Sequence, residues 1–263
     1  MTETLAAACR TVLLTAEPAA KLMAARRVAR DWRLGRIDHD FDVAMPDAPA
    51  RPARPELLPP GRMPRRGRAG SARARIAMLH ALAHIEFVAI DLAFDLVGRF
   101  GGEFPRGFAD DWLAVGADEA MHFALLDRRL ATLGSGYGAL PAHGGLWASA
   151  AATARDPLAR LAIVPMVLEA RGLDVTPDMI ARFEAVEDTG SARILARIYQ
   201  DEIRHVAAGT HWFRFGCQVI RADPVRKWQS LVAEHFSGGL RPPFNDSARR
   251  QAGLTRDYYM SVA

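Results

Sequence analysis

Apolar residues recur every three or four positions along most of the chain, which predicts helices that each bury one face. Glycine and proline separate these segments. We predict helices over residues 2–34 with a break at Pro18, and over 72–99, 108–133, 146–155, 158–171, 176–186 and 191–220. The predicted fold class is therefore all-α.

The helix predicted over 72–99 carries a glutamate, Glu86, on its apolar face. A carboxylate in that position costs several kcal/mol unless it is paired or bound to a cation. We therefore interpret Glu86 as a metal ligand. Two histidines of the same helix, His80 and His84, point about 120° and about 160° away from Glu86. We expect them at the edge of the core or at the surface rather than at the metal.

Two five-residue stretches share the form Asp-Glu-x-x-His, at 118–122 and 201–205. On a helix, side chains three positions apart differ by about 60° in direction and about 5 Å in height, so a glutamate and a histidine at this spacing reach one point. Each stretch is therefore a predicted half of a metal site. The predicted ligands are Glu119 with His122, and Glu202 with His205.

A further candidate ligand, Glu169, lies in another apolar segment. Glu86 lies 33 residues before Glu119, and Glu169 lies 33 residues before Glu202. That separation is about two half-helices and a short turn, so each pair is predicted to sit level in an antiparallel helical hairpin. Two such hairpins form a four-helix bundle with the ligand set of ferritin-like dimetal carboxylate proteins. We predict two divalent ions, iron first and manganese as the alternative, because carboxylate and imidazole ligands suit both.

Four residues near these ligands are predicted to support them. Asp118 and Asp201 each precede a ligand glutamate, and we expect each to accept a hydrogen bond from the histidine of the other motif. Arg204 is expected to keep one of these aspartates ionised. Tyr199 lies one turn before Glu202 on the same face, either as a redox or supporting residue or as a buried structural tyrosine.

The helix that carries Glu169 is predicted to be interrupted on both sides. Pro165 lies four residues earlier and removes a backbone donor, whereas Gly172 follows closely and Thr176-Pro177 is typical of a fresh helix start. Two interpretations stay open. The interruptions either open a substrate path and let Glu169 change its coordination, or they only redirect the chain.

Residues 45–70 differ sharply in composition from the rest of the chain. They hold seven prolines and six arginines, so we predict an extended, polyproline-like linker or surface wrap. No aromatic residue is interleaved for stacking on bases, so nucleic-acid contact is not favoured, although the arginines leave it open. The predicted organisation is a helical extension (1–44), this Pro/Arg-rich segment (45–70), the ferritin-like bundle (71–220) and a C-terminal helix and tail packed on the bundle (221–263).

The net charge of +4 and the sequence pI of about 9.5 come from an excess of arginine. Four arginines form a basic face in the first predicted helical region: Arg26, Arg27, Arg30 and Arg33. We expect this face to be solvated. A homodimer is compatible with the sequence.

The remaining composition predicts a cytoplasmic protein. Cys9 and Cys217 are too few for a disulfide framework and fit a reducing compartment. The first residues do not have the pattern of a secretory signal peptide, and no uninterrupted apolar run reaches the length that spans a membrane. We therefore expect no membrane partner.

Several stretches together resemble an uncharacterised bacterial ferritin-like family, a domain of unknown function. These stretches are 80–86, 110–113 with 118–122, 141–147, 168–177 and 201–206. The motif at 201–205 is also similar to that of bacterial dimetal monooxygenases and of the small subunit of ribonucleotide reductase, and the architecture is similar to that of ferritin-like tRNA hydroxylases. The stretch at 118–122 lacks the arginine of that motif, so this second similarity is partial.

The resemblance implies dioxygen activation at two metal ions. The expected function is an oxidase or hydroxylase with a small-molecule or RNA-borne substrate and an electron donor. The alternatives are iron oxidation, storage or sensing, and a metal-stabilised binding protein without turnover. Storage is less favoured, because the Pro/Arg-rich segment and the extra helices would obstruct the packing of a ferritin cage.

Overall fold

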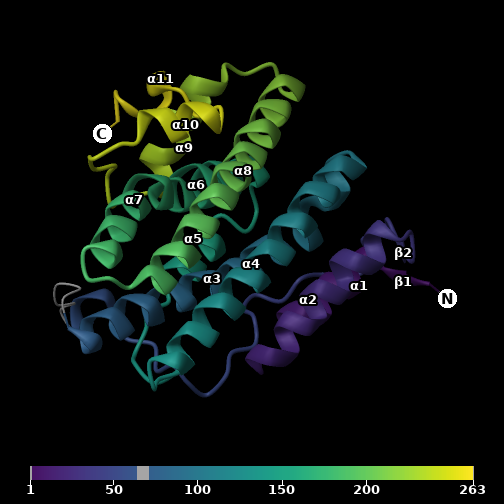
Figure 1. Cartoon of the computed structure of the whole chain (residues 1–263). Coiled ribbons are helices and arrows are strands. Elements are labelled where there is room, and N and C mark those ends of the chain that lie inside the picture. The colour runs from purple at the N-terminus through teal and green to yellow at the C-terminus, as the bar shows by residue number, and fades with distance from the viewer. Residues whose placement is uncertain (1, 64–70, 263) are drawn as a thin grey trace. The chain divides into compact units, whose positions relative to one another are not determined.

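Nearly all of the regular structure is helical, as Figure 1 shows for a computed structural model that describes residues 2–63 and 71–262. In this described part of the chain, two short strands, β1 (Glu3–Thr4) and β2 (Ile37–Asp38), pair in parallel. The predicted all-α class is confirmed. The chain divides into two compact units, unit 1 (Met1–Trp147) and unit 2 (Ala148–Ala263).

Unit 1 is organised around a long helical hairpin. Its helical elements are α1 (Leu5–Leu13), α2 (Pro18–Arg33), the 3₁₀ turn η1 (Pro60–Arg62), α3 (Ala72–Phe100), the 3₁₀ turn η2 (Gly101–Glu103), α4 (Arg106–Thr132) and the short α5 (Gly145–Ala152), which runs past the unit boundary. The start of α3 follows the sequence prediction, because the Ser71 hydroxyl accepts a hydrogen bond from the Ala74 amide at 3.2 Å. Helices α3 and α4 pack along each other, α1 packs on α3, and α2 packs on α4.

Helix α3 is apolar enough and long enough to cross a membrane, judged by composition alone. The stretch Ala72–Glu103 has an 18-residue window with a mean hydropathy of 1.6, and 72% of that window is buried inside the protein. Such burial is typical of the core helix of a soluble protein, because a spanning helix exposes its apolar side chains to lipid.

The Pro/Arg-rich segment runs over unit 1 and is held by backbone hydrogen bonds. The Ala50 amide donates to the Leu13 carbonyl at 2.8 Å, and the Leu58 amide donates to the Ala142 carbonyl at 2.7 Å. The Ala142 amide donates in turn to the Glu56 carbonyl at 2.9 Å. The rest of the predicted wrap, residues 64–70 with Pro64, Arg65, Arg66 and Arg68, lies outside the described residues.

A buried ion network ties this segment to α3. Asp91 is fully buried and pairs with both Lys21 of α2 and Arg51 of the segment. Burial raises the pKa of Asp91, and burial also lowers the pKa of Lys21. Breaking one partner of such a network leaves an uncompensated buried charge, so the network fixes the segment and α2 on the core helix.

Unit 2 contains a second helical hairpin and a C-terminal group of helices. Its elements are α6 (Pro157–Ile163), the π-helical turn η3 (Val164–Glu169), α7 (Ala170–Glu184), α8 (Thr189–Val219), α9 (Pro224–His235), α10 (Asp246–Gln251) and α11 (Arg256–Tyr259). Asp156 caps α6 as predicted, its carboxylate accepting from the Ala159 amide at 2.9 Å. Helices α7 and α8 form the hairpin and pack along each other.

One predicted break in unit 2 is wrong. Helix α7 runs without interruption through Gly172 and Pro177, where the sequence indicates an end and a new start. Pro177 cannot donate to the Leu173 carbonyl one turn earlier, but the side-chain amide of Asn245 donates to that carbonyl at 3.2 Å. A residue far along the chain thus replaces the missing hydrogen bond. The other predicted interruption takes the form of η3, whose wide turn accommodates Pro165.

Candidate metal centre

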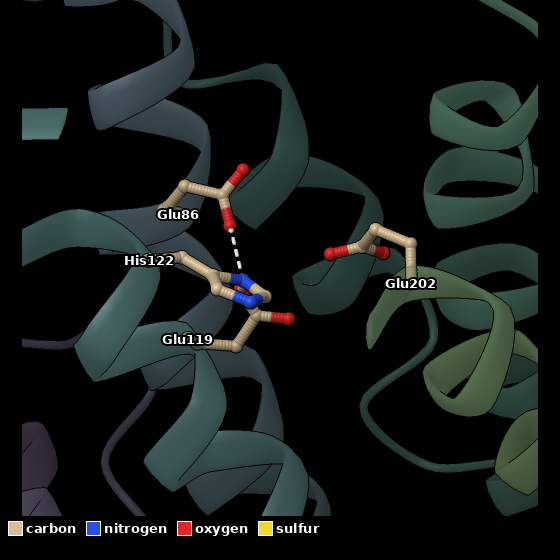
Figure 2. Close-up of side chains that lie close together, drawn as sticks. All are labelled: Glu86, Glu119, His122 and Glu202. Carbon is tan, nitrogen blue, oxygen red and sulfur yellow. Dashed lines mark hydrogen bonds and ion pairs between the residues drawn. The ribbon is translucent and has the colours of Figure 1, made fainter. Parts of the chain in front are cut away.

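Three of the predicted ligands meet inside the α3–α4 hairpin. Glu86 comes from α3, and Glu119 and His122 come from α4 (Figure 2). His122 Nδ1 lies 3.1 Å from Glu86 Oε2 and 3.5 Å from Glu119 Oε2. One ligand atom from each of the three residues lies within 4.8 Å of the others, and all three side chains are buried. We call these three residues the unit 1 half-site.

The short turn between α3 and α4 explains why these residues meet. Glu86 lies about as far before the turn at η2 as His122 lies after it, so an antiparallel pair brings them level. Gly116 allows the two helices to come close, because a Cβ atom there would lie 2.6 Å from the Phe94 ring of α3. The half-site therefore follows from the hairpin and one small residue.

The electrostatics of the unit 1 half-site favour a positive charge among the carboxylates. Burial opposes protonation of His122, but hydrogen bonds to Glu119 and Glu86 and the charges of both carboxylates outweigh it and raise the pKa of His122 to about 11. In the protein without metal, an imidazolium at neutral pH therefore offsets the two carboxylates. A metal ion bound through Nδ1 would replace this proton.

The second motif has the same internal geometry in unit 2. His205 Nδ1 lies 3.4 Å from Glu202 Oε1 on α8, and both side chains are buried. Glu169 ends η3 and is half-buried. We call Glu202 and His205 the unit 2 half-site.

The predicted supporting residues of unit 2 have clear partners. Asp201 is buried and accepts from Arg197 Nε at 2.6 Å and from the Arg204 guanidinium. Tyr199 is half-buried, and its hydroxyl accepts from the Asn245 side chain at 2.9 Å, which ties it to the C-terminal segment. Asp118 is half-buried on α4. The crossed pairing of Asp118 and Asp201 with the histidines of the opposite motifs stays a prediction.

The sequence indicated that the two other histidines of α3 lie either at the edge of the core or at the surface. The structure excludes the surface. His80 and His84 are 1% and 4% exposed. His80 Nε2 accepts from the Gly138 amide at 2.9 Å, and His84 Nδ1 lies 2.9 Å from the Tyr137 hydroxyl. Both histidines hold the loop after α4 against α3.

Sequence reasoning missed Tyr137 as a neighbour of the half-site. Its ring lies 5.2 Å from that of Phe87 and 5.0 Å from that of Phe123, the residues that follow Glu86 and His122. Burial raises the pKa of the Tyr137 hydroxyl, so it stays protonated and can donate to His84. In the sequence, Tyr137 stands out only as a single aromatic residue between two glycines in a loop. This pattern is a weak indication of a residue near a site.

Comparison with known proteins places the chain in a family. The family described as "Protein of unknown function (DUF455)" matches residues 14–260. The chain belongs to this family. A relative from Haemophilus influenzae, described as "Uncharacterized protein", is 40% identical over 225 residues, which cover 82% of this chain and 78% of the relative. No solved structure matches the chain.

In this member of the DUF455 family, the unit 1 half-site fits a divalent cation. Two carboxylates and one imidazole nitrogen are ligands that iron, manganese and zinc accept. Four thiolates would instead indicate a structural zinc site, and the chain has two cysteines. The buried Glu–Glu–His cluster could therefore hold a metal ion, and its chemistry leaves the identity of that ion open.

Acid is expected to destabilise the loop contact beside this half-site through His84. Burial, and next the charge of Arg51, lower the pKa of His84 to about 4. Because this lies below the unfolded value of about 6.5, the stability that neutral His84 contributes is present above pH 6.5 and is lost as the pH falls toward 4, by up to about 3 kcal/mol. Urea unfolding of the metal-free protein at pH 7 and pH 4 measures this loss.

The matched comparison for this prediction is His84→Gln, which can still bond to Tyr137 but does not titrate. We expect the variant to lose less stability than the wild type over the same pH range. Equal losses in the two proteins would show that His84 does not titrate in this way.

Proposed function

We propose that this protein is a dimetal carboxylate protein in which the two half-sites and Glu169 form one centre for two divalent ions, iron first and manganese second. The observation that carries the proposal is the shared geometry of the two motifs. In each, Nδ1 of the histidine faces the glutamate of the same motif, at 3.5 Å for His122 and 3.4 Å for His205. A centre for two ions of the ferritin-like type uses one such Glu–His pair from each of two helices.

The proposal includes a four-helix arrangement of the ferritin-like type. The α3–α4 hairpin supplies one Glu and one Glu-x-x-His pair, and the η3–α7–α8 hairpin supplies the same set. The equal spacing of 33 residues within each pair supports this repetition. Packing the two hairpins together would bring Glu86, Glu119, His122, Glu169, Glu202 and His205 around one point.

The charges of the half-sites also support a shared centre. Four carboxylates and two imidazoles carry a formal charge that two divalent ions would balance, whereas four carboxylates alone would repel one another. Within unit 2, the ion pairs of Asp201 with Arg197 and Arg204 balance the charge of that carboxylate.

The chemistry proposed for this centre is dioxygen activation by two reduced metal ions, in an oxidase or hydroxylase. The residues of this chain would bind the ions and keep water out through the apolar side chains around α3 and α4, and His122 would give up its extra proton to solvent on metal binding. The π-helical turn at 164–169 ends at Glu169, and such turns are frequent at functional sites. We place the substrate, a small molecule or an RNA-borne group, on that side, with an external electron donor.

Anaerobic loading with Fe(II) followed by mixing with dioxygen tests this function. The expected result is consumption of dioxygen in proportion to the protein, with about two irons bound per chain. Hundreds of irons per chain would instead show iron storage. The proposal would be contradicted if the purified protein contains zinc and consumes no dioxygen after iron loading. That result would indicate a metal-stabilised binding protein.

A further inference from the structure

A groove of about 1110 Å³ lies between α2 and α4 in unit 1. Arginine dominates its polar lining: Arg26, Arg27, Arg30 and Arg33 come from α2, and Arg106 comes from α4. Asp110 is the acidic residue among the described residues that line it. The basic face that the sequence predicts as solvated is therefore one wall of a concave surface.

The floor of this groove is apolar and built from small side chains. It is formed mainly by alanines, Ala24 and Ala29 from α2 and Ala114 and Ala117 from α4. Met23 stands at its rim with 67% of its surface exposed. Small residues along two packed helices let a third helix approach to ordinary packing distance, and an exposed apolar hollow with a polar rim is typical of an interaction site.

Two of the arginines are available to a partner. Arg27 is paired with Glu3, and Arg30 with Asp31. Arg26 and Arg33 are exposed and make no ion pair in the described part of the chain. Because they lie two helical turns apart on α2, they would meet acidic residues at similar spacing on a bound helix.

Two other occupants fit the groove less well. Single-stranded nucleic acid needs open aromatic faces, but Trp32 is only 3% exposed and is covered by Arg106 at 3.7 Å. Trp32 Nε1 also donates to Asp110 at 2.7 Å, and this carboxylate would repel phosphates. Insertion into a lipid surface needs a face of large apolar side chains, whereas Met23 is the exposed large apolar residue among those that line the groove.

We propose that the groove between α2 and α4 binds an acidic amphipathic helix of a partner protein. The apolar face of that helix would lie on the alanine floor, and its acidic residues would pair with Arg26 and Arg33. This is the helix-in-groove mode of recognition, with charge providing specificity. The proposal concerns a different face of unit 1 from the half-site, and its outcome is independent of the metal.

The test uses the full-length protein and a designed helical peptide of about 14 residues, long enough to cover the groove along α2. The peptide carries leucines at helical spacing on one face and glutamates on both flanks, with a fluorescein label for anisotropy. We expect saturable binding that weakens as salt is raised. Arg26→Glu with Arg33→Glu should weaken binding by at least about tenfold, and Ala114→Trp, which fills the floor, should also weaken it.

The control for charge is the double variant Arg182→Glu with Arg193→Glu, because both of these arginines are exposed on helices of unit 2. It should bind the peptide as the wild type does. A scrambled peptide of the same composition should bind at least about tenfold more weakly, because it has charge but no apolar face. Equal binding of the scrambled peptide would overturn the proposal. Single-stranded RNA or anionic vesicles would replace the helix as the proposed ligand if they bind more tightly than the peptide does. That binding would also have to be lost in the variant Arg26→Glu with Arg33→Glu.

Discussion

Replacing Glu119 with alanine is expected to remove tight metal binding from the unit 1 half-site. Glu119 is 1% exposed, and its carboxylate lies 3.5 Å from Nδ1 of His122. Loss of a residue that only orients a ligand typically costs 10–100-fold in metal affinity, so loss of a ligand should cost more than about 100-fold. Metal content per chain, measured after loading with Fe(II) or Mn(II) and removal of unbound metal, should fall from about two to one or none.

Glu103→Ala is the matched control, because Glu103 is an exposed glutamate in the turn between the same two helices. It should retain the metal content of the wild type. Circular dichroism should show that both variants keep the helical content of the parent. Wild-type metal content in a folded Glu119→Ala protein would refute the assignment of Glu119 as a ligand.

Metal loading is expected to stabilise the folded protein strongly. The half-site exists only in the folded chain, because the α3–α4 hairpin brings Glu86 to His122. A ligand that binds only the folded state at about a thousand times its Kd adds about 4 kcal/mol, which for a chain of this size raises the Tm by about 8–16 °C. Thermal unfolding with and without Mn(II), followed by circular dichroism, measures this change.

The origin of the stabilisation can be separated from a general salt effect. His122→Ala should lose most of the shift with Mn(II), and calcium, which prefers sites of oxygen ligands, should give a much smaller shift in the wild type. Binding should also release a proton at pH 7, because the raised pKa of His122 keeps its imidazole protonated until a metal replaces the proton. An equal shift in wild type and His122→Ala would place the stabilising ion elsewhere.

Local features of the fold could be predicted from the sequence. The caps at Ser71 and Asp156 act over three residues, and the structure contains both. The unit 1 half-site depends on one i,i+3 pair and one short hairpin. The sequence spacing was therefore enough to predict that Glu86, Glu119 and His122 meet. The caps are set within one helical turn and the half-site by one short hairpin, and helical geometry leaves few alternatives in either case.

The features that sequence reasoning missed depend on contacts between distant residues. Helix α7 continues past Pro177 because Asn245, 72 residues after Leu173, supplies the missing donor. His84 is buried because Tyr137, 53 residues later, folds back on it. No local pattern specifies such partners, since they depend on how the loops return to the helices.

We propose above that the half-sites of unit 1 and unit 2 hold two metal ions in one centre. Anomalous X-ray diffraction from crystals of the Mn(II)-loaded protein tests it most directly. The claim predicts two anomalous peaks about 3.5–4 Å apart, one beside His122 and the other beside His205. A single peak at one half-site, or two peaks separated by more than about twice that distance, would contradict it.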